Sequence, residues 1–172
     1  MKDVLKILGF LLLAEILTLF INVTLAFSGS WIFRLVTAVC TLAILAGLMA
    51  QAGHSIGKAD RKLLKQKPDA VHPKKPVVLG LVSILPFQIL WILLTLAKCG
   101  VLDGGFYRFY KLLCAPFLQV CNLVCDDVTA ASLPVWGLVI LAILSVIPYA
   151  AVIIAYRMTM KGKSVEEMMY QK

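Results

Sequence analysis

Four long apolar segments constrain the fold of this chain more than any other feature. They cover residues 7–27, 35–53, 76–97 and 128–156, and Glu15 is the one formally charged residue within them. Each segment can cross a hydrocarbon core about 30 Å thick, which takes about 20 helical residues. Because lipid cannot satisfy backbone hydrogen-bonding groups, such segments fold as helices. The sequence therefore predicts an all-α integral membrane protein with four transmembrane helices.

The remaining segments are too short to bury a core of their own. The chain has 172 residues, of which 61% are hydrophobic, so we expect residues 1–172 to form a single membrane domain. The predicted helices cover residues 4–27, 31–53, 76–97 and 134–157, each to within a few residues. The linker 55–75 is expected to begin helically, from Lys58 to Gln66, and to be broken by its prolines.

Basic residues gather where alternating helices would leave the chain on one side of the membrane. The linker 55–75 carries seven basic residues against two acidic ones, and both ends of the chain are also basic. The positive-inside rule then places the linker and both termini in the cytoplasm, so we expect a multi-pass protein of the cell membrane (N-in, C-in). A polybasic stretch beside a membrane also attracts anionic lipid headgroups, although it serves equally well as a topology signal. The basic residues of the linker are Lys58, Arg61, Lys62, Lys65, Lys67, Lys74 and Lys75.

The net charge of +8 would suggest a nucleic-acid partner in a soluble protein. Here the charges lie beside membrane helices, so the expected partners are membrane lipids and no nucleic acid.

The segment 98–133 is predicted to be an amphipathic outer segment in the second outer loop. Residues 106–111 form a cluster of aromatic and basic residues, which is suited to headgroup depth. The uncharged run 112–125, interrupted by Pro116, is shorter than a spanning helix. We therefore expect an interfacial or re-entrant helix. If the run did span the membrane, the fourth helix would invert, which the placement of charge disfavours.

Glu15 is the first candidate for a functional site. It lies about 11 residues into the first helix, near the middle of the membrane at about 1.5 Å per residue. The same count places Thr41 with Cys40, Gln88 and Ser145 at a similar depth. A polar layer at that level would satisfy the carboxyl and could bind a proton, a cation or a polar substrate. The alternative is that Glu15 only fixes the register of the helices.

Asn22 and Arg34 form a second candidate polar pair, nearer the outer face. Each lies a few residues from the first outer turn, although Arg34 could instead extend to the headgroups. Small residues also recur at four-residue spacing in and after the second helix, as in Ala43 with Gly47 and Gly53 with Gly57. That spacing favours close helix packing, against either another helix of this chain or a second protein.

Four of the five cysteines lie in the outer segment, on the side where disulfides persist. Four cysteines allow three pairings. A bridge from Cys99 to one of the later cysteines would pin the segment to the end of the third helix. The alternative is that all four remain free. They are Cys99, Cys114, Cys121 and Cys125.

The size, the four helices and the cysteines of the second outer loop resemble the quinone-linked thiol oxidases of bacterial envelopes. The activity of that family requires a Cys-x-x-Cys pair at the first outer turn. Here that turn is Ser28-Gly29-Ser30, and the sequence contains no Cys-x-x-Cys. The resemblance is therefore one of architecture and does not imply the family's activity.

Two classes of function remain. The first is a small transporter or transport-accessory component that uses the polar layer around Glu15. The second is a non-catalytic membrane subunit or scaffold that binds anionic lipid and partner helices. In either case we expect a homo-oligomer or a hetero-partner membrane protein. An enzyme ranks third, with thiol-disulfide oxidoreductase chemistry as its only visible route. No cofactor is expected, and the spacing of His54 and His72 fits no metal site.

Overall fold

The computed structural model describes residues 2–25, 30–66, 71–127 and 129–162. In these ranges the chain is helical and contains no strand. The elements in chain order are α1 (Lys2–Thr24), α2 (Trp31–Gln66), α3 (Lys75–Lys98), α4 (Phe106–Leu113), η1 (Ala115–Phe117), α5 (Leu118–Val124), η2 (Ala130–Ser132), α6 (Val135–Leu144) and α7 (Ile147–Met160).

Four helical segments are long and apolar enough to cross a membrane: α1, α2, α3, and α6 together with α7. This confirms the four predicted membrane helices. The helical start expected for the linker is continuous with the second helix, so α2 extends past Gly53 to Gln66. The first half of the predicted linker is therefore the end of α2. Residues 26–27 of the first predicted helix and 67–70 of the linker, including Lys67, lie outside the described residues.

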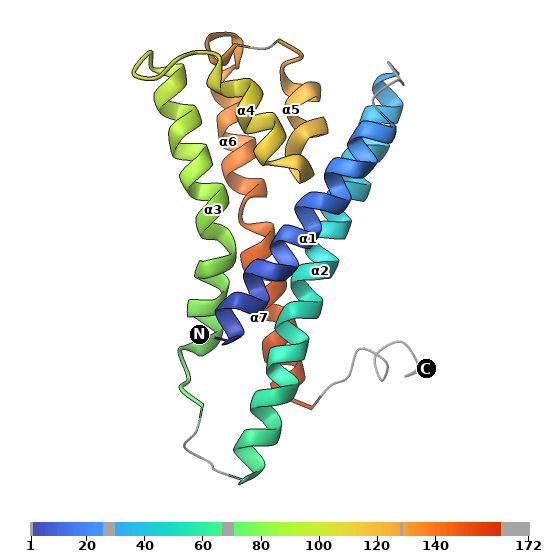
Figure 1. The fold of residues 1–172 in the computed structure, drawn as a ribbon, viewed down its shortest axis with the longest axis vertical. Helices are drawn as coiled ribbons and strands as arrows, with labels where there is room; N and C mark the ends of the chain where they lie inside the picture. The colour runs from blue at the N-terminus through green and yellow to red at the C-terminus, as the bar shows by residue number, and fades with distance from the viewer. Residues whose placement is uncertain (1, 26–29, 67–70, 128, 163–172) are drawn as a thin grey trace.

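The four long segments converge at one end of the bundle and diverge at the other (Figure 1). We call the converging end, where α1 begins and α7 ends, the basic end. At the opposite end α4, η1 and α5 form a helical hairpin, residues 106–124. This hairpin fills the space between the α1–α2 pair and the α3–α6 pair, and it packs against all four (Figure 1). We call this the hairpin end.

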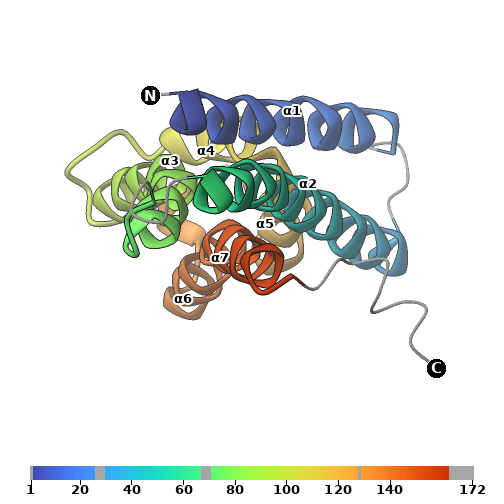
Figure 2. The ribbon, with the colours of Figure 1, turned by 90° about the horizontal axis from the view of Figure 1, so that it is seen from below.

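Helix α2 lies in the middle of the bundle, between α1 and α7 (Figure 2). Each long helix buries one stripe of residues, as α1 does with Ile7, Leu11, Ala14, Thr18 and Asn22. Their spacing of three or four places them on a single helical face. The other faces carry exposed leucine, isoleucine, valine and phenylalanine side chains. Such surfaces suit lipid contact, in agreement with the membrane assignment.

Glycines allow α7 to approach α2 closely. A Cβ placed on Gly53 would lie 2.5 Å from the carbonyl oxygen of Val152, and one on Gly57 would lie 3.0 Å from Cβ of Thr159. Close packing is thus confirmed for these two glycines, and the partner helix belongs to the same chain. By contrast, a Cβ on Gly47 would meet no atom within 4 Å.

The fourth membrane segment is broken where its sequence contains Pro148. Helix α6 ends at Leu144, and α7 begins at Ile147 with the proline in its first turn. A proline is well tolerated at the start of a helix, where its missing N–H is not needed. Pro86, by contrast, lies inside an uninterrupted α3.

Charged and polar side chains join all four long segments at the basic end. Lys75 Nζ lies 2.7 Å from Asp3 Oδ2 and 2.7 Å from Asp60 Oδ1. Tyr156 donates its hydroxyl proton to Asp60 Oδ2 at 2.7 Å. Asp60 is only 2% exposed, and these two partners supply the hydrogen bonds that a buried carboxyl group needs. We call these four residues the basic-end cluster.

Substitution of Gly53 and Gly47 by alanine should separate the effect of packing from that of helix propensity. Gly53→Ala should lower the free energy of unfolding by about 1–3 kcal/mol, because the new methyl group overlaps the α7 backbone. Gly47→Ala should leave stability unchanged or raise it by up to about 1 kcal/mol, because alanine favours a helix and the space is open. Unfolding in mixed micelles, followed by circular dichroism, measures both. Equal effects of the two substitutions would contradict the packing described here.

Candidate functional site

Polar side chains of α1 and α2 bind the turn of the hairpin, residues 114–116. Glu15 Oε2 accepts a hydrogen bond from the backbone N–H of Ala115 at 3.0 Å. Asn22 Nδ2 donates to the carbonyl oxygen of Ala115 at 2.8 Å. Thr41 Oγ1 donates to the carbonyl oxygen of Pro116 at 3.0 Å. We call these three side chains and the turn they bind the turn site.

The turn needs these partners because Pro116 interrupts the hairpin helix. Proline has no backbone N–H to donate, and its ring clashes with the carbonyl group of the residue four positions earlier. The neighbouring peptide groups therefore lose their usual helical partners. Cys114, Ala115 and Phe117 are fully buried or nearly so, which removes water as an alternative partner. Phe117 also packs edge-on against Phe87 of α3, with ring centroids 5.1 Å apart. Buried peptide groups must then find side-chain partners, and the turn site supplies them.

The predicted polar layer divides into two separate groups. Glu15 and Thr41 belong to the turn site. Gln88 of α3 donates instead to Ser145 Oγ at 2.6 Å, at the break between α6 and α7. Ser145 in turn donates to the carbonyl oxygen of Ala142. No hydrogen bond joins the two groups among the residues that the structure describes, but each group lies at an interruption of a helix.

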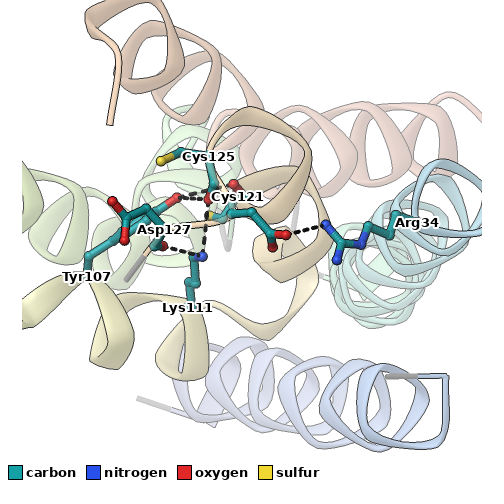
Figure 3. Close-up of polar contacts among 7 residues, drawn as sticks. Arg34, Tyr107, Lys111, Cys121, Cys125 and Asp127 are labelled. Atoms are coloured by element: carbon teal, nitrogen blue, oxygen red, sulfur yellow. Dashed lines mark hydrogen bonds and ion pairs between the residues drawn. The ribbon is translucent and has the colours of Figure 1, made fainter. Parts of the chain in front are cut away.

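The predicted outer pair, Asn22 and Arg34, has different partners for its two members. Asn22 binds the hairpin turn, whereas Arg34 Nη1 lies 3.1 Å from Asp126 Oδ2, just beyond the end of α5 (Figure 3). Both side chains nevertheless line one pocket at the hairpin end. Asp126 was not identified from the sequence, because its closeness to Arg34 depends on how the hairpin folds back.

The two arms of the hairpin are joined at the end of α5 (Figure 3). Lys111 Nζ donates to the carbonyl oxygens of Cys125 and Asp127, at 3.2 and 3.0 Å, and lies 4.5 Å from the centre of the Tyr107 ring. Tyr107 donates its hydroxyl proton to the carbonyl oxygen of Cys121 at 3.2 Å. These bonds satisfy carbonyl groups that the end of a helix leaves open.

The sequence had suggested that the aromatic residues of α4 lie at a surface, but two of them do not. Tyr107 and Tyr110 are buried, while Arg108 and Phe109 are exposed. Helix α4 is therefore amphipathic, and its buried face forms part of the core.

All five cysteines are free thiols in the structure. Cys99 is exposed, Cys125 is partly exposed, and Cys114 and Cys121 are buried. Burial raises the pKa of the Cys121 thiol to about 12 and also raises the pKa of Cys114. Such thiols stay protonated near neutral pH and react slowly. The proposed bridge from Cys99 stays a prediction.

The basic residues of the linker differ in their surroundings. Lys75 belongs to the basic-end cluster. The others that the structure describes are exposed: Lys58, Arg61, Lys62, Lys65 and Lys74.

A pocket of about 450 Å³ opens nearby at the basic end. Its lining includes His72, Arg157 and Lys161, together with Tyr156 and Met160.

Neither histidine belongs to a metal centre in the described part of the chain. His54 Nδ1 lies 2.6 Å from Thr159 Oγ1, in a contact between α2 and α7. Within the described ranges, no group of three His, Cys, Asp or Glu side chains could hold a metal ion.

Comparisons with protein-family profiles, curated proteins and solved structures found no match to this chain. Function must therefore be inferred from the sites themselves. The turn site is the most distinctive of these, because a carboxyl group binds the backbone of a residue 100 positions away.

Two substitutions at Glu15 should have unequal effects on stability. Glu15→Leu leaves the buried N–H of Ala115 without an acceptor and should lower the free energy of unfolding by about 1–3 kcal/mol. Glu15→Gln keeps an oxygen acceptor of the same shape and should have a much smaller effect. Unfolding measured in one detergent compares the two. A Glu15→Leu variant as stable as the wild type would show that the bond to Ala115 is not needed.

Proposed function

We propose that this chain is a small transporter or transport-accessory component, with Glu15 as the proton-binding group of its site. In this proposal the basic end and both termini face the cytoplasm, and the hairpin is re-entrant from the other side. The observation that carries the proposal is the hydrogen bond from the N–H of Ala115 to the Glu15 carboxylate.

Helix interruptions within membrane proteins support this interpretation. Non-helical backbone at membrane depth is tolerated where protein buries it or where it lines a cavity. Transporters use such interruptions to form substrate and ion sites near the middle of the bilayer. Here the helix is interrupted at the hairpin turn and again between α6 and α7. Polar side chains of neighbouring helices bind the chain at both places.

Protonation of Glu15 would change how firmly the turn is held. A charged carboxylate accepts a stronger hydrogen bond than a neutral carboxyl group does. Proton binding would therefore weaken the contact with Ala115, while Asn22 and Thr41 keep theirs. The position of the hairpin would in this way depend on the protonation of one residue. Because four helices rarely enclose a transport path alone, we expect the protein to act as an oligomer or with a partner.

Proton flux into liposomes tests this function without knowledge of a substrate. The protein is reconstituted with a pH-sensitive dye inside the vesicles, and an inward proton gradient is applied. We expect flux above that of protein-free vesicles for the wild type, and a decrease of about tenfold or more for Glu15→Gln, which cannot bind a proton in the same way.

The exposed Lys62→Gln variant serves as the control and should conduct like the wild type. Equal flux from the wild type and Glu15→Gln, at equal stability and equal incorporation, would refute the proposal.

The second candidate function is a non-catalytic membrane subunit that binds anionic lipid. The observation that favours it is the basic-end pocket, whose lining combines Arg157, Lys161 and His72 with apolar side chains. Basic pockets between helices at the cytoplasmic side are typical sites for anionic headgroups.

Lipid binding by this pocket can be measured separately from transport. The double variant Arg157→Gln, Lys161→Gln should lose most of its preference for anionic over zwitterionic lipid in detergent titrations followed by native mass spectrometry. The matched variant Lys62→Gln, Lys65→Gln removes the same charge from an exposed face of α2 and should keep that preference. If both double variants lose it equally, binding depends on overall charge and not on the pocket.

A further inference from the structure

A second, smaller pocket lies at the hairpin end, between α1, α2 and the hairpin. Its volume is about 190 Å³, below the range of roughly 300–1,000 Å³ that holds drug-sized ligands. It is lined by the last turns of α1, the first turn of α2, and both arms of the hairpin. A chemical group the size of a lipid headgroup suits such a space better than a large ligand.

One atom beside this pocket lacks a partner that its burial demands. Asn22 lines the pocket and is only 3% exposed. Its Nδ2 donates to Ala115, but its Oδ1 is buried without any hydrogen-bond partner. Among the described residues, this is the one buried side-chain polar atom in that condition. An unsatisfied buried acceptor costs free energy, so a donor that enters the pocket gains by reaching it.

The remaining polar lining offers complementary groups. Arg34 lines the pocket from α2 and supplies a guanidinium group, of which Nη1 contacts Asp126. Gln119 and Asn122 line it from α5, three residues apart and therefore on neighbouring positions of one helical face. Guanidinium and amide groups together suit a phosphate oxygen well.

The rest of the lining is apolar and continues onto exposed helix surface. Leu19 and Val23 of α1 and Leu118 of α5 line the pocket, and Leu19 and Val23 are themselves exposed. The pocket also lies at the ends of two membrane-spanning helices, where headgroups are found. A ligand with a polar head and acyl chains would match both kinds of surface.

We infer that this pocket binds the headgroup of a phospholipid whose phosphodiester carries an N–H or O–H donor. The phosphate would contact Arg34, and the donor would reach Oδ1 of Asn22. Ethanolamine and glycerol headgroups carry such a donor. A choline headgroup does not, because its nitrogen bears only methyl groups. The site therefore distinguishes lipids of equal chain length by one chemical feature.

Lipid titration followed by native mass spectrometry tests this discrimination. The purified protein in a mild detergent is titrated with phosphatidylethanolamine and with phosphatidylcholine that have identical acyl chains. We expect the first ethanolamine lipid to bind about tenfold more tightly than the choline lipid, the gain expected from one satisfied buried acceptor. Equal affinity for the two lipids would overturn the proposal.

Arg34→Gln and Asp126→Asn form a matched pair of variants. Each removes the ion pair between α2 and the hairpin, but only Arg34→Gln removes the group that would contact the phosphate. Arg34→Gln should therefore weaken binding of the ethanolamine lipid by about tenfold or more, whereas Asp126→Asn should preserve it. Equal losses in both variants would show that the ion pair acts structurally and would overturn the site.

A second variant tests the site if Arg34→Gln does not fold. Asn122→Leu fills the pocket from α5 and should abolish the preference for the ethanolamine lipid over the choline lipid. Retention of that preference in the variant would overturn the proposal.

A water-soluble competitor tests whether the ligand is a lipid. Soluble glycerophosphoethanolamine carries the same headgroup without acyl chains and should not compete at equal concentration. Competition as strong as that of the lipid would identify a water-soluble ligand and refute a lipid site.

Discussion

The rest of the structure depends on how the interrupted backbone at residues 114–116 is satisfied. An apolar bundle cannot leave peptide groups without partners, and Pro116 ensures that the hairpin helix has such groups. Glu15, Asn22 and Thr41 provide the missing partners from two other helices. Because these side chains come from α1 and α2, the hairpin can be inserted only where those helices diverge from α3 and α6 (Figure 1). The need of the peptide groups at 114–116 for hydrogen-bond partners thus determines the arrangement of the whole hairpin end.

The two ends of the bundle are stabilised in different ways. At the basic end, glycines bring α2 and α7 together, ion pairs join α1, α2 and α3, and the Tyr156 hydroxyl group adds α7 through a hydrogen bond. At the hairpin end the contacts are mainly single hydrogen bonds from side chains to backbone groups. The first arrangement favours tight packing of long helices, whereas the second accommodates a short irregular segment. Both candidate pockets lie at these ends, and neither passes through the bundle.

The sequence was sufficient to predict the four membrane helices, because a run of about 20 apolar residues has few alternatives in lipid. It also singled out Glu15, Thr41, Gln88 and Ser145, each of which takes part in a hydrogen bond to another segment of the chain. It did not identify the partner of Glu15, because a backbone N–H carries no signature in the sequence. Depth counting assumed straight and parallel helices, and it therefore merged two groups that the structure separates. The sequence predicted a helix that ends near Gly53 and a second helical stretch that begins at Lys58, whereas the structure joins them in one helix, α2.

The basic-end cluster has a mechanical consequence. Lys75 holds α1 and α2 through Asp3 and Asp60, and Tyr156 adds α7 to the same cluster. The long helices are therefore joined to one another at this cluster and diverge toward the hairpin end (Figure 1). If a helix of more than 20 residues rotates by a few degrees about this cluster, its far end moves much further than the residues near the cluster. Geometry alone thus concentrates any relative motion of the helices around the inserted hairpin.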